Sequence, residues 1–403
     1  MRKSHRIPLL ADHHSHPSAY AAMNGCLDLR DVHDKRQALE LIRHREEEIV
    51  FVLGWNNSLY GFDRDELEAL PPTFICDAAL CGFLVNDAAR ERLIDGYPDV
   101  IARIEDGAWV ERNLHTIIKL IVGVRGCGVD DLAAFYDGIL RVGVWSAEEM
   151  LLANRDVLGA FEQADLLDRT GIWADPDTYL ALDQDARGKV HGIKLFADGA
   201  LAARTAAISE PFLSGERGFL LRTDRELGRL ITEFSVEGKP LAIHAVGDRA
   251  TDQILRVMED ERTRCSSPSV RIEHCAFLTV GQAERAKSAG VTLSVQPNFS
   301  IESVDYRDRL SEEWCARNHP FRMLIDEVGF VPGDDLVFGS DGAPHGAEFG
   351  LQMALFPPYS SQRLTLDEFV AGYCLPDLSR GHIDVEVDGE ERTVTVKAIA
   401  IEP

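Results

Sequence analysis

The sequence predicts an α/β fold in which parallel strands alternate with helices and close into an eight-stranded barrel. The first observation is that short apolar runs in the second half of the chain alternate regularly with amphipathic stretches, the pattern of strands joined by crossover helices. The second is that three similar runs in the first half bring the expected strands to eight, which favours a barrel over an open sheet. The expected strands span residues 9–12, 142–145, 170–173, 192–196, 241–245, 270–274, 291–295 and 336–341.

Helical spacing of apolar side chains predicts helices over residues 225–237, 253–261, 280–288 and 321–327. The stretch after the first strand contains two more strand-like runs, 49–54 and 73–76, and is interpreted as an insertion. The tail alternates polar and apolar residues around Asp388-Gly389, which predicts a β-hairpin. The expected domains are a barrel formed by residues 1–24 and 136–380, an insertion at 25–135 that covers the active-site mouth, and a hairpin tail at 381–403.

Composition and charge narrow the range of partners. The 403 residues include 67 acidic and 42 basic side chains, and the formal net charge of −25 repels the phosphates of nucleic acids and anionic membrane surfaces. The chain has no run of about 18 apolar residues and no start resembling a signal peptide, so a cytoplasmic protein that acts on a small molecule is expected. Its eight cysteines form no Cys-x-x-Cys motif, which favours reduced thiols.

The sharpest local motif is Asp12-His13-His14-Ser15-His16, which directly follows the first expected strand. In an extended segment the side chains at i and i+2 share a face. His14 and His16 would then lie about 6–7 Å apart and could converge on one metal ion. The alternative is a polar loop that carries three histidines by chance.

Four more candidate ligands lie at or near the carboxyl ends of expected strands, the edge where α/β barrels assemble their active sites: Lys194, His244, His274 and Asp341. Each has a structural alternative, since a strand histidine can be a hydrogen-bonded core group and Asp341 can cap a helix. Lys194 alternates with apolar neighbours and would face the barrel interior, where burial lowers the pKa of a lysine. A neutral amine can take up carbon dioxide and become an anionic, bidentate carbamate.

Taken in order, these residues resemble the amidohydrolase superfamily of metal-dependent hydrolases. The resemblance is closest to its YtcJ-like branch, which includes N-substituted formamide deformylases, and it extends over roughly residues 8–375. The matching motifs lie at residues 54–56, 193–200, 204–207, 243–250, 271–274, 295–297 and 338–341.

The resemblance implies a TIM barrel and two divalent metal ions, usually zinc, although the ligand types also suit manganese, iron or nickel. Relatives carry a flanking β-sandwich, which must here be absent or reduced to the hairpin after Gly381. Its loss leaves barrel surface that a homo-oligomer could cover. The implied ligands are His14, His16 and Asp341 for one ion, His244 and His274 for the other, and carboxylated Lys194 as the bridge.

The predicted reaction is hydrolysis of an amide-type carbon-nitrogen bond, N-acyl or N-formyl. A hydroxide that bridges the two metal ions would attack the carbonyl carbon, and Asp341 would act as general base and then as general acid on the leaving nitrogen. The alternatives are a mononuclear deaminase of the same superfamily, which needs no lysine ligand, and a non-catalytic metal- or ligand-binding barrel. Metal stoichiometry and a substrate screen separate the three.

Substrate contacts are predicted from the loops that follow the strands and from the insertion. The candidates are Asp198, Arg204 and Gln296 in the barrel and Trp55 with Cys81 in the insertion. Asp198 and Arg204 could instead form a structural ion pair, and Trp55 could belong to the core of the insertion. Relatives place histidine at the position of Cys81, and Thr-Ser followed by Asp around Glu148-Glu149. His345 is expected either at the same mouth or in solvent.

Overall fold

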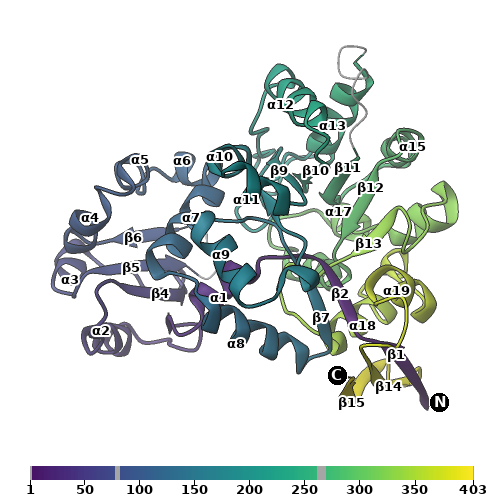
Figure 1. Ribbon diagram of the computed structural model, residues 1–403, viewed down its shortest axis with the longest axis horizontal. Helices are drawn as coiled ribbons and strands as arrows, with labels where there is room; N and C mark the ends of the chain where they lie inside the picture. Colours follow the sequence, from purple (N-terminus) through teal and green to yellow (C-terminus); the bar gives the residue numbers. More distant parts are fainter. Residues whose placement is uncertain (1, 78–81, 261–268, 403) are drawn as a thin grey trace. The chain divides into compact units, whose positions relative to one another are not determined.

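The computed structural model describes residues 2–77, 82–260 and 269–402. The chain forms two compact units (Figure 1). Unit 1 is built from Met1–Ala21 and Cys127–Pro403, and unit 2 from the segment between them, Ala22–Gly126. Among the described helices, none combines the length and the apolar character that crossing a lipid bilayer requires.

The centre of unit 1 is a parallel sheet of six strands in the order β13-β12-β11-β10-β9-β8, and a further parallel pair is formed by β2 and β7 (Figure 1). The middle strands are short apolar runs in which Ile193, Ile243 and Ile272 are fully buried, as is typical of parallel strands covered by helices. The strands are β2 (Leu10–Ser15), β7 (Val144–Glu149), β8 (Trp173–Ala174), β9 (Gly192–Phe196), β10 (Leu241–Ala245), β11 (Val270–His274), β12 (Thr292–Val295) and β13 (Leu336–Phe338).

Two backbone contacts connect the β2-β7 pair with the ends of the six-stranded sheet. A parallel bridge joins Glu149, at the end of β7, to Ile172, next to β8. Beyond the end of β13, the amide of Asp341 donates to the carbonyl oxygen of His14 at 2.7 Å. Glycine is required at position 339 because a Cβ there would collide with the backbone nitrogen of His14. The predicted α/β fold with parallel strands is confirmed.

Helices separate the successive parallel strands of unit 1, and several begin with caps that the sequence supplies. Thr223 and Glu226 form a reciprocal capping box at α12, and Thr279 and Gln282 form another at α15. The stretch predicted at 321–327 is helical, but most of it has the wider hydrogen-bond spacing of a π-helix. The helices are α1 (Pro17–Met23), α8 (Val129–Leu140), α9 (Arg155–Gln163), η1 (Leu167–Arg169), α10 (Pro176–Ala181), α11 (Gln184–Lys189), α12 (Asp224–Val236), α13 (Asp248–Glu259), α15 (Val280–Ser288), η2 (Pro297–Ile301), α16 (Glu302–Asp305), α17 (Glu312–Arg317), η3 (Met323–Val328), α18 (Ala347–Leu355), η4 (Ser360–Gln362) and α19 (Leu366–Tyr373).

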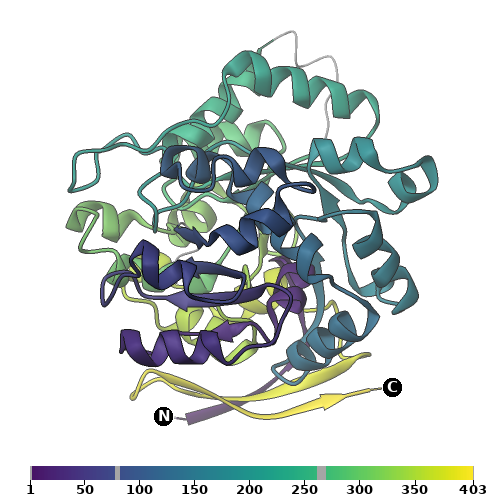
Figure 2. The same cartoon turned by 90° about the vertical axis from the view of Figure 1, so that its left-hand side faces the viewer.

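A three-stranded antiparallel sheet carries both ends of the chain, with the purple β1 beside the yellow hairpin in Figure 2. β14 (Gly381–Asp388) and β15 (Thr393–Ile401) form the predicted hairpin, and β1 (Arg2–Pro8) pairs with β14. β1 was not predicted because its sequence is mostly polar, and its strand character depends on distant partners such as the Arg6 to Asp384 ion pair. In the described residues, the strands that flank the parallel strands are therefore those of this sheet.

Unit 2 is a smaller α/β structure built on the sheet β3-β4-β5-β6, in which β6 alone runs antiparallel to its neighbour. Alternate side chains of its central strands face two separate apolar clusters, with Phe51 and Phe74 in one and Val50, Val52 and Ile75 in the other. The elements are β3 (Leu27–Asp28), α2 (Lys35–Arg43), β4 (Val50–Trp55), α3 (Arg64–Glu68), β5 (Thr73–Asp77), β6 (Phe83–Val85), α4 (Asp87–Leu93), α5 (Pro98–Ile101), α6 (Gly107–Arg112) and α7 (Leu114–Arg125).

Candidate active site

The side chains proposed as metal ligands meet at the carboxyl ends of the parallel strands of unit 1. The ligand atoms of His14, His274 and Asp341 all lie within 4.8 Å of one another, a spacing that suits ligands of one ion or of two adjacent ions. His16, just beyond β2, joins them with its Nε2 3.3 Å from Asp341 Oδ1. Residues from opposite ends of the chain therefore form one polar cluster.

His244 and Lys194 complete this cluster. The ring of His244 lies 4.6 Å from that of His274, and the ring of His274 lies 4.6 Å from that of His14, measured between centroids. The Lys194 side chain is only 1% exposed, and its Nζ has no hydrogen-bond partner within the part of the chain that the structure describes. A buried ammonium that donates no hydrogen bond is unfavourable, even with Nζ 5.4 Å from the centroid of the Phe196 ring, so this position favours an uncharged or chemically modified amine.

The backbone is strained where two of these side chains are presented. His274 has a φ of 72° and Asp341 a φ of 54°, in the left-handed region that residues other than glycine rarely occupy. At His274 this turn breaks the alternation of β11, so that Glu273 and His274 both reach the ring of His14. Such strain costs about 1–3 kcal/mol per residue and is concentrated at functional sites.

Three imidazoles of the cluster are each oriented by a hydrogen bond from one ring nitrogen. His14 Nδ1 donates to Glu273 Oε2 at 2.6 Å, and His274 Nδ1 donates to Gln296 Oε1 at 2.8 Å. His244 uses the other nitrogen, since its Nε2 donates to the carbonyl oxygen of Gly199 at 3.0 Å. These bonds leave Nε2 of His14, Nε2 of His274 and Nδ1 of His244 available as metal ligands.

Burial keeps these imidazoles neutral. It lowers the pKa of His244 to about 3, and it lowers the pKa values of His14 and His274 below their ordinary value. Burial also lowers the pKa of Lys194 to about 8. For Asp341 burial acts in the opposite direction, but the nearby His14 and His16 outweigh it and hold the pKa of this carboxyl well below its usual range. The cluster thus combines imidazoles, one carboxylate and one readily deprotonated amine.

Comparison with known proteins identifies the family. A sequence model of the amidohydrolase family matches residues 132–347, more than half of the chain. This chain belongs to the amidohydrolase family. The resemblance inferred from its motifs is confirmed, and it extends to the YtcJ-like branch. YtcJ of Bacillus subtilis (strain 168), named as an amidohydrolase, is 28% identical over 471 aligned positions that cover 98% of this chain and 85% of that protein.

A shorter match and two solved structures agree with this assignment. LONG AFTER FAR-RED 3 of Arabidopsis thaliana is 30% identical over 141 positions, which cover 34% of this chain and 24% of that protein. An uncharacterized metal-dependent hydrolase from Pyrococcus horikoshii OT3 has a TM-score of 0.68 at 23% identity, covering 87% of this chain and 74% of that one. Another uncharacterized metal-dependent hydrolase, from Pyrococcus furiosus, has a TM-score of 0.67 at 21% identity, covering 91% of this chain and 80% of that one. The two structures share the fold of this chain.

In this amidohydrolase, two of the residues predicted to bind substrate occupy different environments. Asp198 is buried, burial raises its pKa to about 7, and its carboxylate accepts the backbone amides of three loop residues, Ala207, Val246 and Gly247. Arg204 is exposed, and no ion pair with Asp198 is formed in the described structure, where the nearby ionisable partner of Asp198 is His244, 3.6 Å away. Asp198 connects the loops after β9 and β10.

The candidates in unit 2 are Trp55 and Cys81. Trp55 is 7% exposed, belongs to an apolar cluster of unit 2, and donates its indole hydrogen to the carbonyl oxygen of Tyr60 at 2.9 Å. Cys81 lies outside the described residues. A contact of either residue with substrate stays a prediction.

His345 is not simply solvated. Its Nε2 lies 2.7 Å from Ser15 Oγ, and its ring contacts the rings of Tyr20 and Phe135 at centroid distances of 5.0 and 5.3 Å. The segment after Asp341 is thereby fixed to the end of β2, and His345 supports the site rather than lining it as a free imidazole.

Sequence reasoning missed the charged residues that contact the ligands from the interior. Glu273 orients His14, and Arg271 pairs with both Glu273 and Glu148. Although burial opposes it, Arg271 lowers the pKa of Glu148 to about 2. The signal was present in the alternation Arg271-Ile272-Glu273, because two charges on one face of a buried strand require partners.

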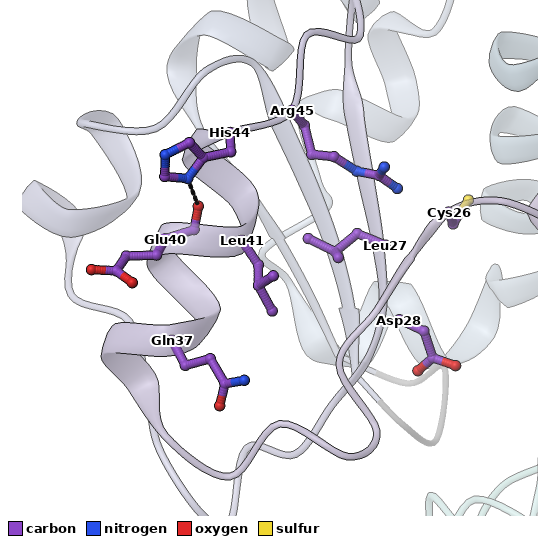
Figure 3. Close-up of a pocket in the computed structure, with 8 residues that line it drawn as sticks. All are labelled: Cys26, Leu27, Asp28, Gln37, Glu40, Leu41, His44 and Arg45. Carbon is purple, nitrogen blue, oxygen red and sulfur yellow. Dashed lines mark hydrogen bonds between the residues drawn. The ribbon is translucent and has the colours of Figure 1, made fainter.

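Unit 2 also has a surface pocket of about 470 Å³, beside α2 and β3 (Figure 3). Its polar groups are engaged locally, since His44 Nδ1 bonds to the carbonyl oxygen of Glu40 at 2.7 Å and Arg45 donates to that of Gly25. No candidate site residue is among the described residues that line it, so this pocket is separate from the predicted site. The lining residues are Cys26, Leu27, Asp28, Gln37, Glu40, Leu41, His44 and Arg45.

Proposed function

We propose that this chain is a metal-dependent hydrolase that cleaves an amide-type carbon-nitrogen bond, N-acyl or N-formyl, in a small molecule. The observation that carries the proposal is the convergence of four imidazoles, a carboxylate and an unpartnered buried lysine at the carboxyl ends of parallel strands. In α/β barrels this edge is where active sites are built. Membership of the amidohydrolase family supports the reaction class.

We further propose that the parallel strands of unit 1 close into a TIM barrel. The six-stranded sheet, the β2-β7 pair and the two backbone contacts between them supply the strands and the connections. Residues 25–135 would then be an insertion in the barrel sequence, and contacts of Trp55 and Cys81 with substrate are part of this proposal.

The residues of the cluster fit two divalent ions, and their imidazole and carboxylate groups suit zinc. The unpartnered Nζ of Lys194 supports this assignment, because a carbamate there would replace a buried cation with an anion. Two such ions would supply a hydroxide nucleophile at neutral pH and polarise the substrate carbonyl. The proposed ligands are His14, His16 and Asp341 for one ion, His244 and His274 for the other, and carboxylated Lys194 between them.

The protein's own part in the reaction is to hold these ligands and to move one proton. Asp341 is ionised at neutral pH because His14 and His16 outweigh the effect of burial on its pKa, so its carboxylate can accept a proton as general base. Cleavage of an amide requires a proton on the leaving nitrogen, and the same carboxyl group can deliver it. Tyr20 fixes the backbone of Asp341 by donating to its carbonyl oxygen at 2.9 Å.

The test measures metal content, the chemical state of Lys194 and turnover on the same purified protein. We expect two divalent ions per chain, a carboxylated Lys194 in crystallographic density, and hydrolysis of N-formyl or N-acyl amines. Lys194→Met should lose both metal and activity. Lys189→Met is the matched control, because Lys189 is on the surface and pairs with Glu162 and Asp185, and it should keep both.

Two outcomes would contradict the proposal. One ion per chain, an unmodified Lys194 and turnover of aminopyrimidines would indicate a mononuclear deaminase. Bound ions without turnover of amides, carbamates, lactones or aminopyrimidines would indicate a non-catalytic metal-binding barrel.

A further inference from the structure

Three charged side chains form a continuous series of contacts behind His14. Arg271, on β11, donates from Nε to Glu273 Oε1 at 2.6 Å, and its two terminal nitrogens contact the two oxygens of Glu148, on β7, at 3.1 and 2.8 Å. The other oxygen of Glu273 accepts from His14 Nδ1 at 2.6 Å. A charged group on β7 is therefore linked by direct contacts to a proposed metal ligand on β2.

These contacts are buried and fixed in geometry. The Glu273 side chain is 0% exposed and that of Arg271 is 11% exposed. The guanidinium lies over the ring of Trp173, 4.7 Å from its centroid, and the Trp173 indole donates to Glu148 at 2.6 Å. Arg271 also donates to the carbonyl oxygen of His13 at 3.1 Å. A planar guanidinium engaged on all these sides has little freedom, so Glu273 is held in one orientation.

The groups that orient the three imidazoles differ in charge. His14 is hydrogen-bonded to a carboxylate at 2.6 Å. His274 is hydrogen-bonded to the neutral amide of Gln296, and His244 to the neutral carbonyl of Gly199, with the Asp198 carboxylate at the longer distance of 3.6 Å from the same ring nitrogen. A carboxylate partner raises the basicity of an imidazole ligand more than a neutral acceptor does. The two proposed metal positions therefore differ in the strength of their ligands.

We infer that Arg271 and Glu148 are positioning residues that act through Glu273 on His14, and that they make the position formed by His14, His16 and Asp341 the tighter of the two. This inference rests on the proposed function. Without the guanidinium, Glu273 would lose the contact that fixes its orientation, and its hydrogen bond to His14 Nδ1 would no longer be held in one geometry. Glu148 supplies the second carboxylate that holds Arg271 in place.

Competition with a chelator, with bound zinc counted by elemental analysis at each chelator concentration, measures the two affinities. Arg271→Met is expected to weaken the tighter position roughly 10–100-fold and to leave the weaker one unchanged. Glu148→Gln should act in the same direction with a smaller effect. Arg285→Met is the matched control, because Arg285 also pairs with two carboxylates, Asp252 and Glu259, but on the surface.

A second readout uses the metal-free protein. With 15N-labelled histidine, NMR should show the Nδ1 hydrogen of His14 as a downfield resonance, because its bond to a carboxylate is short and charge-assisted. Arg271→Met should shift this resonance, and Arg285→Met should leave it in place. If Arg271 had a purely structural role, Arg271→Met would lower the unfolding temperature. The His14 resonance and the order of the two zinc affinities would then stay unchanged.

An Arg271→Met protein that folds and binds zinc at both positions as the wild type does would overturn the inference. If this variant does not fold, Glu148→Gln gives the answer: an unchanged tighter position overturns the inference and a weakened one supports it. Two unequal zinc positions in a wild-type protein that hydrolyses no amide would contradict the proposed function alone. A wild-type protein that binds no zinc would contradict both.

Discussion

Two regions of unit 1 use charged side chains in different ways: the carboxyl-end edge of the parallel strands and the flanking sheet β1-β14-β15. At the edge, Lys194 and Glu273 are buried, and their surroundings determine their charge state. In the flanking sheet, Arg6 pairs with Asp384 in contact with solvent. A buried charge depends on its partner because no water replaces it, whereas an exposed charge stays hydrated when the partner is lost.

The backbone conformations of the two regions differ as well. His274 and Asp341 adopt left-handed conformations at the edge, whereas β1 pairs with β14 in an unbroken antiparallel register from Arg2 to Pro8. At the edge the left-handed residues are proposed ligands themselves, whereas in the flanking sheet the left-handed Arg392 lies in the hairpin turn. Substitutions at the edge should therefore change the chemistry, and substitutions in the flanking sheet should change stability alone.

The largest effect is expected from Asp341→Asn. The amide cannot serve as a general base, so kcat should fall roughly 10²–10⁴-fold. Asp384→Asn makes the same chemical change in the flanking sheet and should leave kcat unchanged, because its carboxylate touches only surface groups. Steady-state kinetics and metal analysis of both variants test this contrast. Full activity with full metal content in Asp341→Asn would show that another group moves the proton.

Much of the carboxyl-end edge could be predicted from the sequence, because its proposed ligands lie on or after strands that can be recognised as short apolar runs. β9, β10 and β11 begin and end at the residues predicted, so that His244 and His274 lie in the last two positions of their strands and Lys194 lies in the middle of β9. The topology of parallel strands then brings these ends together, whatever the details of the intervening loops.

The parts that could not be predicted depend on contacts between distant segments. Glu273 and Arg271 are adjacent to a predicted ligand, but their role depends on His14 and Glu148, which lie far away in sequence. β1 carries a mostly polar sequence, and it becomes a strand because β14 offers a partner. Local periodicity reports which face of an element is buried, and it does not report which distant group a polar side chain will meet.

An intermediate effect, on stability rather than catalysis, is expected from Ile383→Ala in the flanking sheet. Ile383 is 0% exposed and lies close against Gly143, at the start of β7, so its truncation leaves a cavity. Unfolding free energy should fall by about 2–5 kcal/mol, with kcat per folded molecule unchanged. Ile401→Ala, at a position that is 48% exposed, should change the free energy of unfolding by less than about 0.5 kcal/mol. Denaturant titration of both variants measures the difference, and a loss of kcat in Ile383→Ala would contradict the separation of the two regions.

The smallest effect is expected from Arg6→Met. The side chains of Arg6 and Asp384 are 56% and 35% exposed, so water replaces the lost contact and salt already screens it. The denaturation midpoint should match that of the wild type at physiological ionic strength, and any small loss at low ionic strength should disappear when salt is added. Arg271→Met breaks the same kind of contact in the interior, where screening is weak, so its loss of stability should persist at every salt concentration. Equal salt dependence of the two variants would mean that burial does not distinguish the two regions. It would contradict the positioning role proposed for the buried contacts of Arg271.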